Sequence, residues 1–449
     1  MRTHYFSVTF TAAAAIVIAS GPGAAPAATV NEEIKVVPAD TAEADFFGDA
    51  TAVSGLTAIL GASGDDDNGP ASGSAYLYNA VFGTQTFKLL ASDGATFDLF
   101  GTAVGIDGTT AIVGAPGIST THLTAGAAYL FDTTTGAQLF KLTATDGAID
   151  DKFGISVGVR GTTAIVGAGF KDDNGADSGA AYLFDATTGL QLFKLSPTDG
   201  AAGDRFGAGV AIDGTTAIVG ADGDDDNGAD SGAAYLFDTK TGTQLFKLLP
   251  ADGAAGDRFG ASVDISGAIA IVGAGLADAN GVDSGAAYIF DTTTGVQIAK
   301  ITPDDAAAGD WFGGLGPGGV AISETTAVIA AVGASPVALR SGTAYLFDLI
   351  TGQQLAKFVP SDGAADDLFG TAAISGVIAI VGASSDDDAC PGGDAANCPF
   401  GQGQSGSAYF FNARICAPTT CSPADINGDG VVDTADLGVL IGAFGTTCP

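Results

Sequence analysis

The chain contains few of the residues on which most catalysis and nucleic-acid binding depend. Its 449 residues include two histidines, one tryptophan and one methionine, and only 16 basic residues against 51 acidic ones. The resulting net charge of −35 disfavours contact with nucleic acid or anionic lipid and attracts divalent cations. Charged residues nevertheless make up only 15 % of the chain and apolar residues 46 %, which excludes a disordered acidic chain and favours a packed fold.

The motifs of common enzyme classes are missing as well. The sequence has no nucleophile elbow, Walker-type phosphate loop or histidine-rich metal cluster. His122 lies in the irregular loop Ser119–Thr124, and a single loop histidine is usually a surface residue. Trp311 takes a position that Phe or Leu fills in other repeats, so we interpret it as packing and not as a sugar platform. We therefore expect no enzyme, and the abundant carboxylates leave a two-carboxylate glycosidase as the alternative.

A long apolar run is also absent. No stretch approaches the roughly 18 uninterrupted apolar residues of a membrane span. The short apolar run Phe10–Ala19 follows Arg2 and His4 and precedes the small-residue site Ala25-Pro26-Ala27. This pattern is typical of a secretory signal peptide, here residues 1–28, and predicts a protein that is secreted or held at the cell surface, without a membrane span after cleavage. An uncleaved membrane anchor is the alternative.

Cysteines are few and confined to the C-terminal part of the chain. They are Cys390, Cys398, Cys416, Cys421 and Cys448. Export permits disulfides, and Cys390 and Cys398 flank one loop that they would bridge. A Cys421–Cys448 pair would enclose the tail motif described below and leave Cys416 over, so the pairing of these three stays open.

What the chain does contain is a long repeat. Seven Phe-Gly pairs recur, with five gaps of 53 residues and a last gap of 57, and each is followed by a Gly-Ala pair and a Gly-x-Ala-Tyr segment. Repeats of this length bury their apolar faces only against their neighbours. The phenylalanines are Phe47, Phe100, Phe153, Phe206, Phe259, Phe312 and Phe369; the Gly-Ala glycines are Gly61, Gly114, Gly167, Gly220, Gly273, Gly333 and Gly382; the tyrosines are Tyr76, Tyr129, Tyr182, Tyr235, Tyr288, Tyr345 and Tyr409.

Each repeat has the pattern of four short strands joined by turns. Asp-Gly and Gly-rich segments separate apolar runs, and the last run alternates polar and apolar residues, as an outer, half-exposed strand should. Seven units of four antiparallel strands predict an all-β, seven-bladed β-propeller. In the fourth unit the expected strands are Ala208–Ile212, Thr216–Gly220, Ala233–Phe237 and Gln244–Leu248.

The last unit lacks its fourth strand. Its expected strands are Gly370–Ile374, Val377–Gly382 and Ser407–Phe411, and nothing resembling QLFKLL follows. Glu33–Ala39 resembles the missing segment, so we expect the N-terminal strand to complete the seventh blade and close the ring. An open solenoid is the alternative.

The Phe-Gly…Gly-Ala unit followed by Ser-Gly-x-Ala-Tyr-x-Phe resembles the FG-GAP repeat. That repeat builds the seven-bladed propeller of integrin alpha subunits and of many secreted bacterial proteins, and the likeness covers residues 31–412. It implies recognition or adhesion, with a protein or glycan ligand outside the cell, and calcium in an Asp-rich hairpin loop of some blades. It is specific for the fold and much less so for the function.

Five blades have an acidic loop after Gly-Ala. Calcium requires six to eight oxygen ligands on a sharply turned loop, which these loops could supply. With Gly228 at the glycine of the integrin-type pattern Asp-x-Asp-x-Asp-Gly-x-x-Asp, however, Gly223 and Ser231 fall on ligand positions. The alternative is that Asn-Gly and Asp-Gly form solvated turns. The candidate ligands are Asp65, Asp67, Asp172, Asn174, Asp225, Asn227, Asp278 and Asn280, and the fifth loop is Asp386–Asp388.

Two further aspartates recur at every blade junction, two and seven residues before Phe-Gly. Seven copies suggest an architectural role, with backbone N–H groups as partners, and a ring of cation sites is the alternative. They are Asp45, Asp98, Asp151, Asp204, Asp257, Asp310 and Asp367, and Asp40, Asp93, Asp146, Asp199, Asp252, Asp305 and Asp362.

The tail, after a linker at 413–424, contains a second candidate calcium motif at 425–445. Its segment DINGDGVVDTAD has the spacing of an EF-hand loop, followed by a helix-like apolar pattern. Asp in place of Glu at the last ligand position resembles a dockerin repeat. A dockerin has two such repeats and this tail has one, which supports calcium binding but puts a cohesin-like partner in doubt. The expected ligands are Asp425, Asn427, Asp429, Val431, Asp433 and Asp436.

The sequence thus predicts a secreted, calcium-binding recognition or adhesion propeller with a small EF-hand-like loop and helix at its C-terminus. A polysaccharide-binding or polysaccharide-degrading component attached through the tail is the first alternative. A structural cell-surface protein is the second.

Overall fold

The structure is a computed structural model that describes residues 28–117, 125–387 and 404–413. The chain divides into a unit Met1–Asn412 and a unit Ala413–Pro449. The described residues form 29 β-strands, all of which belong to the first unit. They contain no helix that is long and apolar enough to cross a membrane. Residues 1–27 of the expected signal peptide, the cysteines, and the tail loop and helix lie outside the described residues, whereas Ala28, the last residue of the expected signal peptide, begins a strand.

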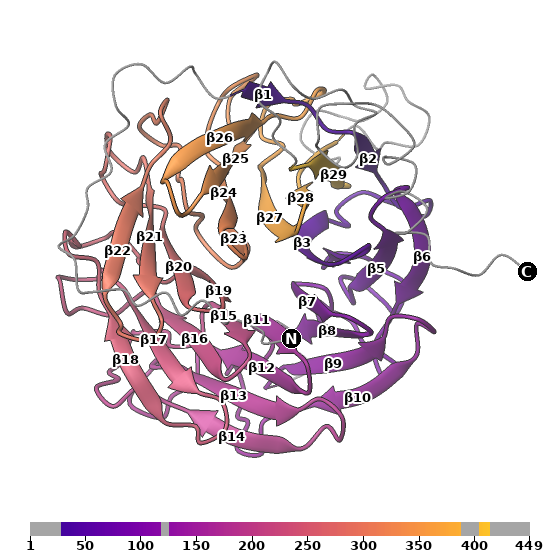
Figure 1. Cartoon of the computed structure of the whole chain (residues 1–449). Coiled ribbons are helices and arrows are strands. Elements are labelled where there is room, and N and C mark those ends of the chain that lie inside the picture. Colours follow the sequence, from indigo (N-terminus) through magenta and orange to yellow (C-terminus); the bar gives the residue numbers. More distant parts are fainter. Residues whose placement is uncertain (1–27, 118–124, 388–403, 414–449) are drawn as a thin grey trace, which may run out of the picture. The chain divides into compact units, whose positions relative to one another are not determined.

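The strands form seven antiparallel sheets arranged as blades around an axis (Figure 1). In blades 1–5 the first strand of the unit lies next to the axis and the fourth lies outermost, as predicted, and in blade 6 one further strand lies outside the fourth. Blade 1 contains β3 (Phe47–Ser54), β4 (Thr57–Ala62), β5 (Ser74–Asn79) and β6 (Thr84–Leu89); blade 2 contains β7 (Ala103–Asp107), β8 (Thr110–Ala115), β9 (Ala127–Asp132) and β10 (Gln138–Leu142); blade 3 contains β11 (Ser156–Arg160), β12 (Thr163–Ala168), β13 (Ala180–Asp185) and β14 (Gln191–Leu195). Blade 4 contains β15 (Val210–Asp213), β16 (Thr216–Ala221), β17 (Ala233–Asp238) and β18 (Gln244–Leu248); blade 5 contains β19 (Ser262–Ser266), β20 (Ile269–Ala274), β21 (Ala286–Asp291) and β22 (Gln297–Ile301); blade 6 contains β23 (Val320–Ser323), β24 (Thr326–Ala331), β25 (Thr343–Asp348) and β26 (Gln353–Phe358).

The two ends of the propeller meet in blade 7, as the sequence predicted. This blade contains β27 (Phe369–Ser375), β28 (Ile378–Ala383) and β29 (Ser407–Asn412), and its outer strand is β2 (Ile34–Val36). β2 pairs antiparallel with β29, and the hydroxyl of Thr371 donates to the carbonyl of Gly48 in blade 1 at 2.7 Å. The ring is therefore closed, and the open solenoid is excluded.

One strand was not expected. β1 (Ala28–Val30) pairs in parallel with β26 and makes blade 6 a five-stranded sheet. Three residues without strong hydrophobic alternation give no signal of a strand in the sequence, because the pairing depends on an outer edge in a distant part of the chain.

The two motifs of the repeat meet at each blade junction. The Phe259 ring packs edge-on against Tyr288 and Phe290 of its own blade, with ring centroids 5.5 and 5.8 Å apart, while its backbone bridges to Gly232 of the preceding blade. Gly232 has φ of +82°, and a Cβ there would lie 2.0 Å from the Phe259 carbonyl oxygen, so only glycine fits. Phe259 is fully buried, and truncating such a ring to alanine costs about 3–5 kcal/mol.

In the sixth unit, our assignment of the Gly-Ala pair to Gly333 is wrong. Ala330 and Ala331 pair with β25 at the ladder position that Gly-Ala fills in other blades. The extra residues of this unit lie earlier, in the loop 314–319 between Phe312-Gly313 and β23. The match to Gly333 failed because this insertion moved the strand within an otherwise regular spacing.

Candidate functional site

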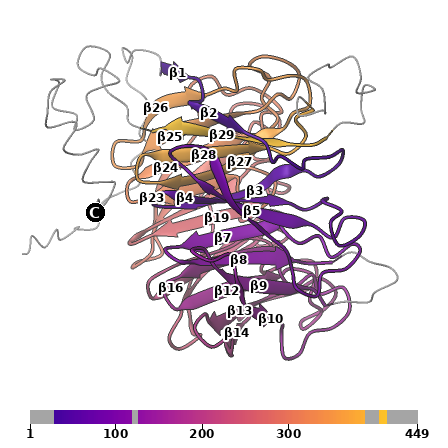
Figure 2. The same ribbon diagram turned by 90° about the vertical axis from the view of Figure 1, so that its right-hand side faces the viewer.

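The acidic loops and the links between blades emerge on one face of the ring, because the second and fourth strands of a blade run in the same direction (Figure 2). Each link is hydrogen-bonded to the acidic-loop segment of the preceding blade. Between blades 3 and 4, the N–H groups of Gly203 and Arg205 donate to the carbonyls of Ala176 and Asp177 at 2.9 and 3.0 Å. The loops of this face, here called the loop face, are thus joined around the ring.

The acidic loop of blade 1 surrounds a lysine ammonium group. Lys88 Nζ lies 2.7 Å from Asp40 Oδ2, 2.9 Å from Asp65 Oδ2 and 2.7 Å from Asp67 Oδ2. The Tyr76 hydroxyl donates to Asp65 at 2.9 Å, and Asp65 is buried. Two residues predicted as calcium ligands, Asp65 and Asp67, are therefore brought together, with a lysine between them.

Blade 4 repeats this arrangement. Lys247 Nζ lies 2.8 Å from Asp199, 2.9 Å from Asp224 and 2.7 Å from Asp226, and the Tyr235 hydroxyl donates to Asp224 at 2.8 Å. The carboxylates around the lysine are thus one residue away from the predicted ligands Asp225 and Asn227. The ligand positions counted from Gly228 in the integrin-type pattern thus differ by one residue from the loop carboxylates that pair with the lysine.

Every blade has the core of this cluster, a lysine from the outer strand paired with the aspartate seven residues before Phe-Gly. The Nζ–Oδ distances are 2.5–2.8 Å, and the ammonium group lies 5.1–5.6 Å from the centroid of the blade's tyrosine ring. We call these groups the lysine clusters. The pairs are Lys35–Asp362, Lys88–Asp40, Lys141–Asp93, Lys194–Asp146, Lys247–Asp199, Lys300–Asp252 and Lys357–Asp305.

Charge pairing dominates the protonation of these groups. Burial would raise the pKa of Asp199, but hydrogen bonds from Lys247 and Tyr235 hold it below its usual range. The balance for Asp65 is the same: burial opposes ionisation, while Lys88 and the Asp67 N–H keep its pKa low. Burial would lower the pKa of Lys88, and its carboxylate partners raise it above the usual value instead. Asp65, Asp199 and Lys88 are therefore charged at neutral pH.

The other predicted loop ligands serve the turns. Asp172, Asp225 and Asp278 each accept, through Oδ1, the backbone N–H five residues later, at 2.8–2.9 Å. The backbone N–H groups of Asn174, Asn227 and Asn280 donate to serine hydroxyls four residues later at 2.8–3.1 Å. Such bonds are those of a hydrogen-bonded polar turn, and calcium in these loops stays a prediction.

The aspartates two residues before Phe-Gly cap the links between blades. Each accepts the backbone N–H three residues earlier at 2.5–2.9 Å, as with Asp204 and Ala201. Burial raises their pKa where a shift is resolved, to about 6 for Asp45. Trp311 is half-buried beneath the Arg340 guanidinium, which lies 5.9 Å from its ring centroid. These contacts agree with architectural and packing roles.

The lysines were not among the residues predicted from the sequence, although they carry a clear signal. Six of them recur at the 53-residue spacing of the repeat, in the same outer strand position. A positive charge recurring beside a recurring Asp is a stronger indication of an ion pair than of a metal, because a cation would be repelled by it. Asp425, Asn427, Asp429, Val431, Asp433 and Asp436, as well as His122, lie outside the described residues.

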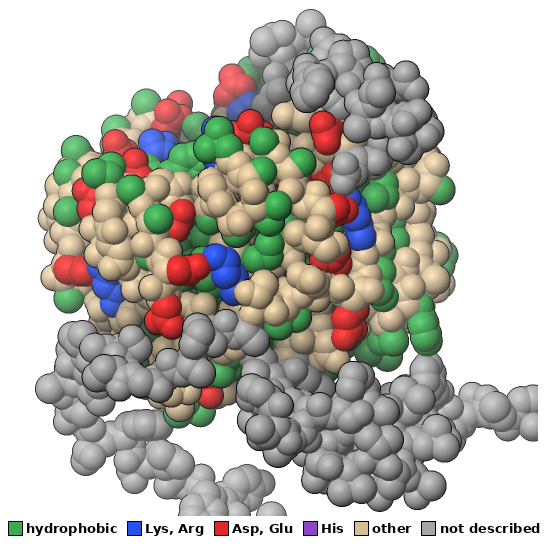
Figure 3. Space-filling view, turned by 90° about the horizontal axis from the view of Figure 1, so that it is seen from above, with side chains coloured by type: hydrophobic (Ala, Val, Ile, Leu, Met, Phe, Trp, Pro, Cys, Tyr) green, Lys and Arg blue, Asp and Glu red, His purple; other side chains and the backbone are tan. Residues whose placement is uncertain are grey.

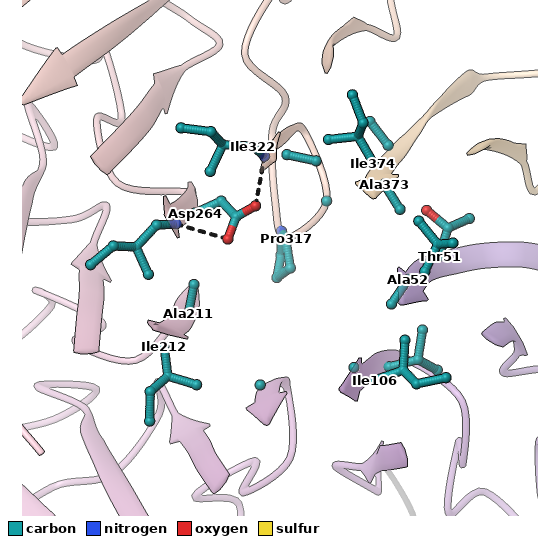
Figure 4. A pocket seen from close by; sticks show the side chains of 18 of the residues that line it. Thr51, Ala52, Ile106, Ala211, Ile212, Asp264, Pro317, Ile322, Ala373 and Ile374 are labelled. Atoms are coloured by element: carbon teal, nitrogen blue, oxygen red, sulfur yellow. Dashed lines mark hydrogen bonds between the residues drawn. The ribbon is translucent and has the colours of Figure 1, made fainter. Parts of the chain in front are cut away.

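A second region lies on the axis. The first strands of all seven blades line a cavity of about 480 Å³, the axial cavity (Figure 4). At one level of this cavity six blades contribute alanine or glycine, and blade 5 contributes Asp264. The small residues at the positions equivalent to Asp264 are Ala52, Gly105, Gly158, Ala211, Ala321 and Ala373.

The fold and its motifs define a seven-bladed β-propeller built from repeats. A family model described as the FG-GAP repeat matches residues 30–78, 84–131, 137–184, 190–237, 243–290, 296–347 and 353–411, which are most of the chain. The chain therefore belongs to the FG-GAP repeat family. Propellers of this family usually bind protein ligands and are typical of extracellular or surface proteins, so membership indicates a ligand-binding or adhesion-type protein.

No curated protein is similar enough to be matched. Among solved structures, the crystal structure of the computationally designed Ika8 protein is 14 % identical, with a TM-score of 0.46, over 85 % of this chain and 99 % of its own.

Proposed function

We propose that the protein is exported and recognises a protein ligand through the loop face, as an adhesion or recognition propeller. The proposal includes no catalytic step. The observation that carries it is the set of large apolar side chains exposed on loops of this face, at positions that most other blades fill with small or polar residues. They are Phe97, Ile149, Phe170, Val282, Val337 and Leu339, which are 39–68 % exposed.

These side chains lie on a backbone that is already ordered. The N–H of Phe97 donates to Pro70 and that of Phe170 to Asp151, at 2.8 and 3.4 Å, while Val282 and Leu339 accept bonds from the next links. Loops ordered before binding lose less conformational entropy when the ligand arrives. Aromatic side chains in such loops are typical anchors of protein interfaces.

The charge of the surface supports a protein ligand with basic patches. Acidic side chains are spread over one side of the molecule, with few basic ones and apolar side chains between them (Figure 3). Because like charges repel, this surface selects against acidic polymers and accelerates encounter with basic partners.

Calcium enters the proposal through the tail. Calcium in the blade 1 or blade 4 loop would have to displace Lys88 or Lys247, because each ammonium group already lies between three carboxylates. We therefore assign calcium to the loop 425–436, on its ligand spacing alone. Calorimetry on the full chain should give about one ion, lost in the Asp425→Asn variant. Several ions that survive this substitution would place calcium in the blades.

The recognition role is tested with exposed apolar residues on the two faces. Surface plasmon resonance against a panel of extracellular matrix proteins should identify a ligand for the full chain. The double variant Phe97→Ser with Phe170→Ser should bind it at least tenfold more weakly, which is about 1.4 kcal/mol. Leu190→Ser, in a hairpin on the opposite face and 66 % exposed, is the control and should bind normally. No binding across the panel, or equal losses in both variants, would contradict the proposal.

A further inference from the structure

The axial cavity has the size of a small-molecule site. Its volume of about 480 Å³ falls within the range of ligand pockets, roughly 300–1,000 Å³. The lining combines apolar side chains, including Ile106, Ile212 and Ile374, with eleven polar or charged ones, seven of which are serines or threonines. In such pockets apolar walls contact the ligand and the polar groups fix its orientation.

Asp264 is the polar group that breaks the symmetry of this lining. Its Oδ1 accepts the N–H of Ile265 and its Oδ2 the N–H of Ile322, both at 2.8 Å, and the side chain is only partly exposed (Figure 4). Each oxygen has a second lone pair, which these two bonds leave unused. Among the described residues, no lysine or arginine forms an ion pair with Asp264.

The cavity is bounded differently at its two ends. The insertion 314–319 precedes β23, and its Pro317 and Gly318 line the cavity. The carbonyl of Gly318 accepts the N–H of Ala372 of blade 7 at 2.7 Å, which anchors this loop across the start of the first strands. An insertion that occurs in a single repeat thus narrows one end of the axis.

The other end has an acidic rim. Arg160 donates to Asp107 at 3.3 Å and to Asp213 at 2.9 Å, so one cation faces two carboxylates, and Glu324 adds a third. Arg160, Asp213 and Glu324 are the charged residues that line the cavity besides Asp264. An acidic rim on a chain of net charge −35 concentrates cations at this opening.

We propose that the axial cavity binds an organic cation, an alkyl or arylalkyl amine, whose ammonium group pairs with Asp264 while its apolar part contacts the first strands. A bare divalent ion fits less well. Calcium needs six to eight oxygens, and this level of the cavity offers one carboxylate among alanines and glycines. Burial among apolar residues raises the pKa of Asp264 to about 7, and an ammonium group would offset this cost of ionisation.

The experiment uses benzylamine as the probe and the full chain at pH 8, where both partners are charged. Calorimetry should detect binding of benzylamine and not of benzyl alcohol, which has the same ring but no charge. Asp264→Asn should weaken benzylamine binding at least tenfold, and lowering the pH to 5 should weaken it similarly, because Asp264 becomes protonated. Asp225→Asn removes the same charge on the loop face and should leave the affinity within twofold.

Thermal unfolding checks that the variants are folded, and competition by calcium chloride separates specific pairing from screening. Equal affinities for amine and alcohol, an unchanged affinity in Asp264→Asn, or no heat at millimolar benzylamine would overturn the proposal. So would equal weakening by Asp264→Asn and Asp225→Asn, since this would mean general attraction to an acidic chain.

Discussion

The periphery of the propeller repeats one arrangement seven times, whereas its axis contains residues that occur once. Each lysine cluster joins an outer strand to the link that enters its blade, so each blade needs one. Asp264 and the loop 314–319 have no counterpart in the other six blades. A residue that recurs in every blade stabilises its own blade. A residue that occurs in one blade gives the ring a feature that the repeat itself does not supply. The axis is therefore the better place to look for ligand chemistry.

The lysine clusters themselves differ between blades. In blades 1 and 4 three carboxylates surround the ammonium group, while in blade 2 Lys141 pairs with Asp93. Where the acidic loop supplies extra carboxylates, lysine occupies the position that a cation needs. One positive charge thus offsets part of the negative charge of each of these loops.

The largest loss of stability should follow removal of the lysine from a cluster with three carboxylates. In Lys88→Met, Asp40, Asp65 and Asp67 keep oxygens within 4.8 Å of one another without a cation between them. Because Asp65 is buried while Asp40 and Asp67 are almost half exposed, breaking this group should lower the free energy of unfolding by about 2–3 kcal/mol in urea melts. Calcium at millimolar concentration should restore part of this loss, because three carboxylates now form a cation site.

Lys141→Met is the matched control for this comparison. Its ion pair with Asp93 is more exposed, so the expected loss is about 1 kcal/mol, without recovery in calcium. Equal losses in the two variants would mean that the extra carboxylates of blade 1 do not matter. Calcium rescue of the wild type would show that the loop binds metal with its lysine present.

The architecture could be predicted from the sequence because every copy repeats the same signals. Phe-Gly, Gly-Ala and the tyrosine recur at one spacing, and the incomplete last blade identified β2 as its missing strand. The site was harder to predict. In blade 4 the lysine pairs with Asp224 and Asp226 and not with the predicted ligand Asp225. Counting positions along the acidic loop does not indicate which of these carboxylates the lysine contacts. Asp264 could not be identified as a site residue from the sequence, because it is a single acid in an apolar strand. The cavity that it lines forms only when the first strands of all seven blades surround the axis.

A smaller effect should come from the tyrosine hydroxyls. The Tyr235 hydroxyl donates to Asp224 at 2.8 Å and to Asp199 at 3.2 Å, and its ring is buried. Tyr235→Phe keeps the ring and removes these bonds, so urea melts should show a loss of about 1–2 kcal/mol. Tyr345→Phe in blade 6, where the hydroxyl donates to Asp305, should cost less. An equal or larger loss in blade 6 would contradict the added role of the acidic loop.

The last prediction concerns the pH dependence of stability, which should differ between the axial Asp264 and the aspartates of the lysine clusters. Asp199 and Asp252 of the lysine clusters have lowered pKa values, so their contribution to stability is lost only as the pH falls below about 4. The pKa of Asp264 is raised to about 7, so its neutral form favours the fold below pH 4, and this contribution declines as the pH rises through 7. In Asp264→Ala the decline is absent.

The free energy of unfolding of Asp264→Ala, relative to the wild type, should therefore increase by about 1–2 kcal/mol between pH 4.5 and pH 8. Asp45, with its pKa raised to about 6, titrates in the same range. Its contribution to stability is the same in both proteins and therefore cancels in the difference. Ala211→Ser, which changes an equivalent position in blade 4 without a titrating group, should show no such trend. A difference that stays constant with pH would mean that Asp264 is hydrated like a surface acid, and the axial cavity would then lose its charged anchor.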